Sequence, residues 1–149
     1  MEIKAKPKIF HYQVGVRWDR EKRGVLAAAG KPGLEVASPP EFRGHPGIWS
    51  PEDLLVAAVN ACTMLTFLSA MKRREIALVS YESDATGTLE MADGKFRFTR
   101  VVLRPRIVVG RPEDRDAALA AFREAETGCL VANSLLAVIE SDPEIVASS

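Results

Sequence analysis

Apolar and polar residues alternate along the first part of the chain, and this pattern predicts β-strands. Over residues 9–18 one face is apolar and carries Tyr12, Val14, Val16 and Trp18. Shorter extended segments are expected at residues 24–29 and 34–37, separated by the turn sequence of residues 30–33. The chain is therefore predicted to open with a β-meander.

A long apolar run between residues 50 and 74 predicts a single helix. Ser50 can cap it, Pro51 suits the first helical position, and Glu52 and Asp53 complement the positive end of the helix dipole. Successive basic residues close the run, where the dipole favours cations.

The central part of this run, residues 54–71, approaches the length of a membrane span, which needs about 20 apolar residues. Polar side chains interrupt it at Asn60, Thr63, Thr66 and Ser69. A helix that is apolar on most sides also suits a protein core. We therefore interpret the run as a long buried helix rather than a membrane span.

Two long strands joined by a tight turn are predicted next. Residues 76–91 alternate, and one face carries Glu82, Asp84, Thr86, Thr88 and Glu90. Asp93-Gly94 is a hairpin turn signal, and residues 95–109 form the partner strand. Within that strand Pro105 is expected to mark an edge or a bulge.

Helical signals return towards the C-terminus. Residues 111–114 open a helix that Gly128 is expected to end, and residues 129–139 are expected to form a second helical segment. Residues 144–147 form a short extended piece that could join a sheet. Nothing in the pattern marks a linker, so we predict a single α+β domain over residues 1–149.

Composition narrows the possible functions. Twenty basic residues balance twenty acidic ones, which argues against general affinity for nucleic acid or anionic membrane. The first eight residues lack an apolar run, so we expect no secretory signal and a cytoplasmic protein. His11 and His45 have no ligand partners at a suitable spacing, so no metal site is expected, and the absence of a glycine-rich phosphate loop gives no indication of a cofactor.

The chemistry that remains rests on two cysteines. Free cysteines are often inert core residues, and that interpretation suits Cys62 in its apolar helix. Cys129 follows Thr127 and Gly128, and we expect it to be accessible at a helix N-terminus, where a thiolate is favoured. An attacking and a resolving thiol is the alternative interpretation of the pair.

A reactive thiolate needs a cation beside it, and the first hairpin offers Arg17, Arg20 and Arg23. Glu52 is the carboxylate that could orient one of them, although its place at the helix start explains it equally well. Glu52 precedes Cys62 by ten residues, or about 15 Å along one helix. If both serve one site, a symmetric partner helix would have to supply the carboxylate.

At this point the sequence resembles a known family. Ser50-Pro51-Glu52-Asp53-Leu54-Leu55, followed by Ala57-Ala58-Val59-Asn60-Ala61-Cys62, is similar to the proline-glutamate helix start and cysteine helix of the OsmC/Ohr family. Its members are osmotically inducible and organic-hydroperoxide-resistance proteins. The stretch Glu126-Thr127-Gly128-Cys129 resembles the family's second cysteine motif. The resemblance extends over nearly the whole chain.

The resemblance implies an OsmC-like fold, an intertwined homodimer with active sites at its interface, and a thiol-dependent peroxidase of oxidative-stress defence. Cys62 would attack the peroxide and become a sulfenic acid, and Cys129 would capture it as a disulfide. Glu52 would hold an arginine, for which Arg20 has the best spacing, with Arg17 and Arg23 left open. A small dithiol or a lipoyl-type group would reduce the disulfide again.

Two departures from the family pattern affect the substrate prediction. Leu130 stands where the family often has proline, and the turn lacks the glycines of the organic-peroxide branch. Apolar residues near the cysteine, namely Met64, Leu65 and Phe67, would favour organic hydroperoxides over hydrogen peroxide, although core packing explains them equally well. The alternatives are a non-catalytic ligand-binding or redox-sensing dimer, and a structural stress protein with two inert thiols.

Overall fold

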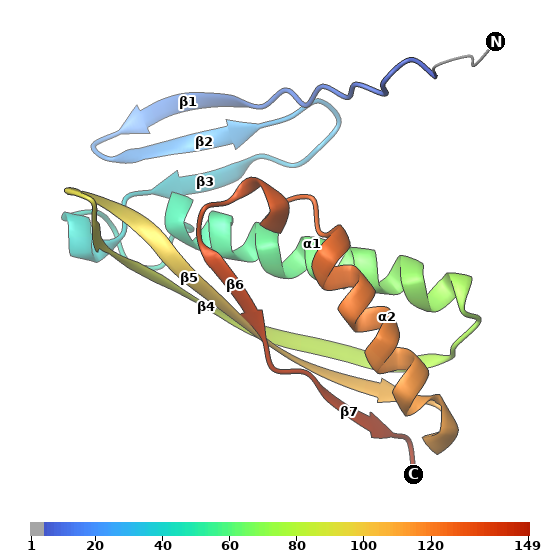
Figure 1. Cartoon of the computed structure of the whole chain (residues 1–149). Helices are drawn as coiled ribbons and strands as arrows, with labels where there is room; N and C mark the ends of the chain where they lie inside the picture. The colour runs from blue at the N-terminus through green and yellow to red at the C-terminus, as the bar shows by residue number, and fades with distance from the viewer. Residues whose placement is uncertain (1–4) are drawn as a thin grey trace. The chain divides into compact units, whose positions relative to one another are not determined.

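The computed structural model describes residues 5–149, and the chain divides after Pro51 into two compact units (Figure 1). The first unit contains an antiparallel three-stranded sheet of β1 (Gly15–Arg20), β2 (Arg23–Ala27) and β3 (Leu34–Ala37), in that order. The short helical turn η1 (Pro40–Phe42) follows. This sheet is the predicted β-meander.

The first strand is shorter than the sequence pattern predicts. Residues 9–14 alternate as a strand would, but they pair with no strand in the part of the chain that the structure describes, because β2 ends at Ala27 opposite Gly15. The apolar side chains of this segment, Phe10, Tyr12 and Val14, are exposed. Val16 and Trp18 of β1 are exposed as well. A strand pattern without a neighbouring strand leaves backbone groups and apolar surface unpaired.

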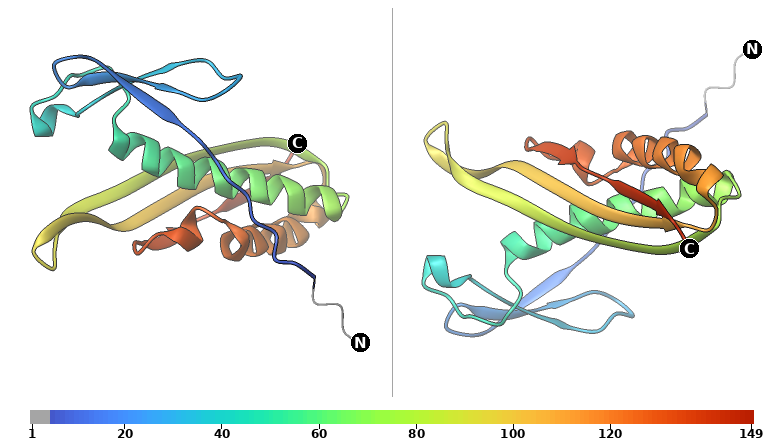
Figure 2. Two further views of the ribbon diagram at one scale, coloured as in Figure 1. Left: turned by 90° about the horizontal axis from the view of Figure 1, so that it is seen from above. Right: turned by 90° about the horizontal axis from the view of Figure 1, so that it is seen from below.

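In the second unit a mixed sheet carries two helices. The strands β4 (Leu78–Ala92) and β5 (Lys95–Val109) form an antiparallel hairpin, and β6 (Val138–Ser141) and β7 (Glu144–Ala147) both pair in parallel with the other edge of β5. The helices α1 (Pro51–Arg73) and α2 (Arg115–Gly128) lie on the same face of this sheet (Figure 1 and Figure 2). The turn η2 (Pro112–Asp114) leads into α2.

The hairpin follows its sequence signals closely. Asp93 and Gly94 both have positive φ, at 51° and 80°, as the predicted two-residue turn requires. Along β4 the expected polar face is the exposed one. Pro105 marks neither an edge nor a bulge: it is buried in the central strand β5, between the stretches that pair with β6 and β7. Because Pro105 lies in the gap between β6 and β7, neither parallel strand requires an N–H group from it.

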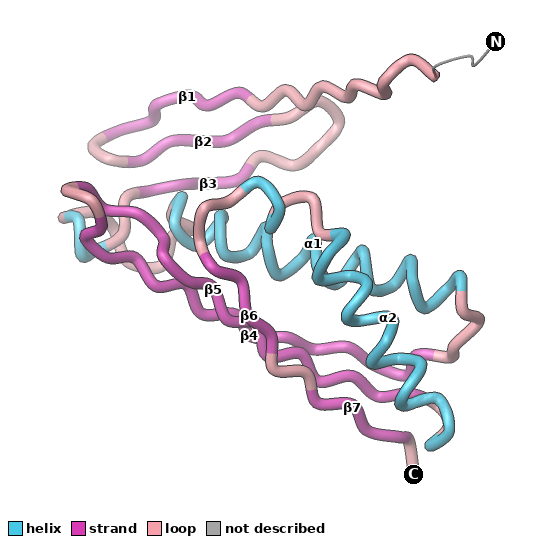
Figure 3. Tube along the Cα trace, in the orientation of Figure 1, coloured by secondary structure: helices cyan, strands magenta, loops and turns pink. Residues whose placement is uncertain are grey.

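The predicted second C-terminal helix is wrong. After α2 the chain forms only the short helical turn η3 (Ala132–Ser134) and then enters β6 (Figure 3). Val138 and Ile139 are β-branched and pair with Arg100 and Val101, on the edge of β5 that β4 leaves open. Hydrogen bonding to a distant strand therefore overrides the local helical pattern.

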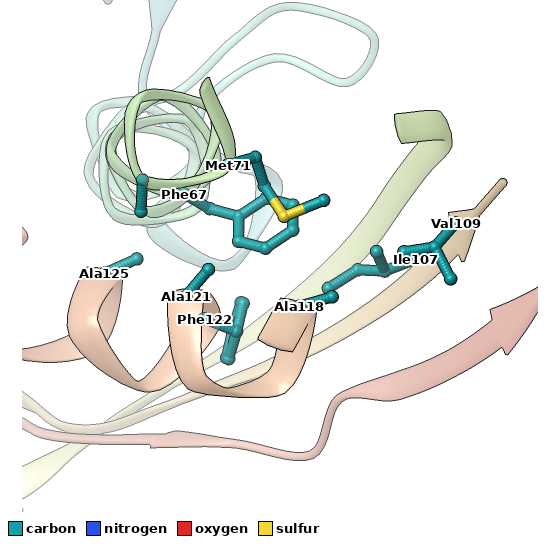
Figure 4. Close-up of a cluster of buried hydrophobic side chains, with 9 residues drawn as sticks. Phe67, Met71, Ile107, Val109, Ala118, Ala121, Phe122 and Ala125 are labelled. Atoms are coloured by element: carbon teal, nitrogen blue, oxygen red, sulfur yellow. The ribbon is translucent and has the colours of Figure 1, made fainter. Parts of the chain in front are cut away.

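The main core lies where α1 and α2 pack together over β5 (Figure 4). Phe67 of α1 stacks in a tilted arrangement against Phe122 of α2, with ring centroids 5.9 Å apart. The facing side of α2 carries small residues that let the helices approach, namely Ala118, Ala121 and Ala125. A smaller cluster joins Val59 to Val101 and Leu103 nearer the start of α1.

Helix α1 is buried on one side only, which corrects the expectation of a fully buried helix. A stripe that includes Ala58, Ala61 and Leu65 is exposed, and Leu65 keeps 58% of its surface. Among the described residues α1 is the one helix long and apolar enough to cross a membrane by length and composition. Its apolar surface exceeds what this chain alone covers.

Candidate active site

The two cysteines lie side by side in the second unit. Cys62 is in the middle of α1, and Cys129 is the first residue after α2, where the backbone leaves the helix with φ −69° and ψ 108°. The thiol of Cys129 donates a hydrogen bond to the sulfur of Cys62. The fold therefore brings together two thiols that lie far apart in the chain.

The surroundings of Cys62 favour its thiolate. Burial has the largest single influence on the pKa of Cys62 and raises it, because it removes water from the charged form. Four hydrogen bonds together outweigh burial and bring the pKa below the ordinary value of a thiol. In order of effect they come from the N–H of Val131, the thiol of Cys129, the N–H of Leu130 and the hydroxyl of Thr66.

The end of α2 makes those backbone donors available. The helix stops at Gly128, and the carbonyl oxygen of Cys129 then accepts a hydrogen bond from the N–H of Asn133 at 3.0 Å. This turn leaves the N–H groups of Leu130 and Val131 outside any regular helix and directs them to the sulfur. Cys129 thus follows a helix C-terminus, which corrects the expected N-terminal position.

The accessibility of the two thiols also differs from expectation. Cys62 is only half-buried, whereas Cys129 has no exposed surface. The hydroxyl oxygen of the buried Thr63 lies 3.5 Å from the Cys129 sulfur. A reagent from solvent therefore meets Cys62 first, and Cys129 behind it.

The backbone donors and the two threonines are site groups that the sequence analysis missed. Side-chain patterns carry no signal for an N–H group, so Leu130 and Val131 could not be found that way. Thr63 and Thr66 did carry a signal, because polar residues directly after a cysteine and one helical turn beyond it interrupt an apolar run. The Thr66 hydroxyl also bonds the carbonyl oxygen of Cys62 at 2.8 Å.

Glu52 lies in the first turn of α1, and the helix that separates it from Cys62 is continuous. The structure therefore does not bring Glu52 to the Cys62 of its own helix, as the spacing predicts. Its Oε2 atom is buried, and no residue in the range 5–149 donates a hydrogen bond to it. A buried carboxylate oxygen in this state calls for a donor or a cation.

The three candidate arginines belong to the first unit. Arg20 lies 3.5 Å from the carboxylate of Asp19, and Arg23 bonds Glu35 at 3.1 Å. Arg17 stands on β1 opposite Val25 of β2. Assignment of one of them to the thiolate stays a prediction.

The apolar residues near Cys62 have different positions. Phe67 is part of the core, Leu65 is exposed, and Met64 lines a hollow of about 260 Å³ between α1 and β4. The other residues lining it are Ala57, Asn60, Ala61, Tyr81 and Ser83. Cys62 does not line this hollow. Leu130, whose backbone N–H bonds the Cys62 sulfur, carries an apolar side chain that is 75% exposed.

Comparison with known proteins identifies the family. Residues 44–143 match the family model described as OsmC-like protein. This chain belongs to the OsmC-like protein family. The match includes Glu52, Cys62 and Cys129, whereas the three candidate arginines precede it.

Relatives of this OsmC-like protein share its fold along almost its full length. An OsmC-like protein of unknown function from Vibrio cholerae superposes with a TM-score of 0.83 at 23% identity, covering 91% of this chain and 99% of that one. An organic hydroperoxide resistance protein OsmC from Legionella pneumophila gives a TM-score of 0.72 at 19% identity, covering 93% and 98%. In sequence, the uncharacterized protein YmaD of Bacillus subtilis is 19% identical and covers 87% of this chain and 89% of its own.

Proposed function

We propose that this OsmC-like protein is a thiol-dependent peroxidase that reduces organic hydroperoxides through Cys62. The observation that carries the proposal is a half-buried cysteine whose pKa is lowered by directed hydrogen bonds and whose sulfur touches a second, buried thiol. A thiolate is the nucleophile that peroxide reduction requires, and an adjacent thiol can resolve the product. The family and a structural relative named for organic hydroperoxide resistance support the same activity.

The reaction would proceed in two steps. The Cys62 thiolate attacks one peroxide oxygen, the O–O bond breaks, and the alkoxide leaves and takes a proton to become an alcohol. Cys62 is then a sulfenic acid, whose hydroxyl leaves as water when the Cys129 sulfur attacks and the disulfide forms. A dithiol or a lipoyl-type reductant would return both thiols by exchange. We propose that this takes place in the cytoplasm as a defence against oxidative stress.

Arg20 and Glu52 complete the proposed site. The buried Oε2 of Glu52 has no hydrogen-bond donor among the described residues, and an arginine held there would stabilise both the thiolate and the negative charge that develops on the peroxide. Since Glu52 is about 15 Å from the Cys62 of its own helix, the carboxylate would come from a second copy of the chain. Arg20 is the preferred arginine, with Arg17 and Arg23 as alternatives.

A homodimer would also cover the apolar surface that one chain exposes. Leu65 on α1 and the apolar face of residues 10–18 are exposed in the single chain. A second copy could bury both, and a C2 interface would create two equivalent sites. Light scattering at micromolar concentration should give twice the mass of one chain. A monomer with full turnover would contradict this arrangement.

Stopped-flow consumption of cumene hydroperoxide tests the activity. With dithiothreitol or a dihydrolipoyl donor the wild-type protein should turn over repeatedly, and Cys62→Ser should abolish turnover. Cys129→Ser should still be oxidised once, and its sulfenic acid should react with dimedone. Full turnover by Cys62→Ser would overturn the mechanism. Oxidation of the wild-type protein without turnover with either reductant would favour a redox sensor instead.

Leu130 is the proposed determinant of preference for organic peroxides. Its side chain is exposed while its N–H contacts the Cys62 sulfur, so an alkyl group on the peroxide could rest against it. Leu130→Ser should lower kcat/KM for cumene hydroperoxide about tenfold, since burying a Leu side chain is worth roughly 1.5–3 kcal/mol. The rate with hydrogen peroxide should not change. Val79→Ser, another exposed apolar position, is the control and should alter neither rate.

A further inference from the structure

Thr63 differs from the other hydroxyl residues of α1 in its burial and in its contact with a cysteine sulfur. Hydroxyl groups on helices often bond the carbonyl one turn earlier without any functional role, and Thr66 and Ser69 both do so here. Thr63 bonds the carbonyl oxygen of Val59 in the same way at 2.9 Å. It alone of these three is fully buried, with 1% exposure, and it alone contacts the Cys129 sulfur, at 3.5 Å.

The Thr63 hydroxyl has two possible acceptors for its single proton. While Cys129 is a neutral thiol, the hydroxyl can keep donating its hydrogen bond to the carbonyl oxygen of Val59. In an α-helix that carbonyl also accepts the N–H of Thr63, so it stays partnered when the hydroxyl turns away. A developing thiolate at Cys129 is a stronger acceptor than a carbonyl that already has a partner. Rotation about one side-chain bond then aims the O–H at the sulfur.

We propose that Thr63 is a positioning residue for the resolving step, and that its hydroxyl donates a hydrogen bond to the Cys129 sulfur while that sulfur attacks Cys62. The inference deepens the proposed function, on which its physiological meaning rests. Cys129 is buried, and among the described residues its thiol has hydrogen bonds with Cys62 and Thr63. When Cys129 gives up its proton to the hydroxide leaving Cys62, Thr63 is thus the neighbouring donor that can stabilise the charge.

The chemistry fixes which step should depend on Thr63. Peroxide reduction uses the Cys62 thiolate, whose donors are other groups. Disulfide formation uses the Cys129 sulfur, and stabilising the anion of a mostly protonated thiol increases its thiolate fraction more than it lowers its nucleophilicity. Loss of the hydroxyl should therefore slow the second step and leave the first unchanged.

The test uses an aromatic disulfide so that it does not depend on peroxidase activity. One equivalent of 5,5′-dithiobis(2-nitrobenzoate) should react with Cys62, forming a mixed disulfide and releasing one thionitrobenzoate. Attack by Cys129 on the Cys62 sulfur then releases a second, which absorbance records as a separate phase. Cys129→Ser should show the first phase only. Circular dichroism and the thermal midpoint check that each variant is folded.

Thr63→Val keeps the shape of the side chain and removes the hydroxyl, and Thr63→Ser keeps the hydroxyl. We expect Thr63→Val to slow the second phase about tenfold or more, because hydrogen bonds to charged groups are stronger than those between neutral groups. The first phase should stay within about twofold of wild type, and Thr63→Ser should restore the second. An unchanged second phase in Thr63→Val would overturn the inference, as would equal slowing of both phases. Failure of the wild type to reduce cumene hydroperoxide would remove the proposed function and leave this result standing.

Discussion

Helix α1 has two contact regions that differ in chemistry. One is with α2, and the other is with the turn that follows α2. Over β5 the two helices meet through Phe67, Met71 and Phe122, with alanines between them, and the buried residues of this cluster are apolar. Beyond Gly128 the partner of α1 is no longer a helix but an irregular turn, which brings the buried Cys129 and two backbone N–H groups to Cys62. One pair of elements thus forms a packed end and a thiol end.

The difference shows how one fold separates stability from reactivity. Within a regular helix the N–H groups bond to carbonyl groups of the same helix, so the packed end has no free N–H group that could donate to an anion. The chain must leave the helix before its N–H groups become free, and it does so where the sulfur needs them. Irregular backbone at the thiol end is therefore what makes the thiolate possible, and the packed end compensates for the regular structure lost there.

The largest expected effect is a loss of stability from the packed end. Phe122→Ala should lower the free energy of unfolding by about 3–5 kcal/mol, because a fully buried aromatic ring leaves a cavity. Urea denaturation measures this loss. If the variant fails to fold, Phe122→Leu should show a smaller loss of about 1.5 kcal/mol or less.

The matched change at the thiol end is Leu130→Ala. The side chain is mostly exposed, so the free energy of unfolding should stay within about 0.5 kcal/mol of wild type. Equal losses from Phe122→Ala and Leu130→Ala would mean that the two ends contribute alike to stability, and the comparison would fail.

The second prediction concerns the ionisation of Cys62. Its lowered pKa means that more of Cys62 is thiolate at a given pH than in an ordinary thiol, and that the thiolate is lost as the pH falls through that lowered value. Alkylation by bromobimane, measured from pH 5 to pH 10, should therefore have a midpoint below that of an ordinary thiol, about 8.5. The half-buried Cys62 should react before the fully buried Cys129.

Removing one donor sharpens this measurement. Cys129→Ala eliminates the thiol that bonds the Cys62 sulfur, so the pKa of Cys62 should rise and the midpoint should move to higher pH. Cys129→Ser keeps a donor at the same position and should shift the midpoint less. Identical midpoints in wild type and Cys129→Ala would show that this hydrogen bond does not support the thiolate.

The two ends also differ in how well their structure can be predicted from the sequence. The packed end and the long hairpin carry strong local signals: a Pro-Glu-Asp helix start, and an Asp-Gly turn between alternating strands. The predicted bounds of α1 accordingly agree within one residue, and those of β5 agree at both ends. Such signals depend on nearby residues alone, which is why they can be read without the fold.

The thiol end depends on contacts that local patterns do not encode. Residues 138–141 become a strand because β5 has a free edge, which no local pattern reveals. The two cysteines could be paired as candidates, but two of the four donors that lower the pKa of Cys62 are backbone groups set by the way α2 ends. The same limit applies in the first unit: residues 9–14 have a strand pattern, but the described part of the chain provides no strand that pairs with them.

The smallest expected effect comes from a surface contact beside the packed end. Glu124 of α2 pairs with Arg73 and Arg74 at the end of α1, and both arginines lower the pKa of Glu124. All three side chains are substantially exposed, where water and salt weaken ion pairs. Glu124→Gln should therefore lower the urea midpoint only slightly, and in 1 M NaCl wild type and variant should converge. The bromobimane rate of Cys62 should not change. A shift as large as that of Phe122→Leu, persisting in high salt, would show that the surface pair and not the aromatic core holds the two helices together.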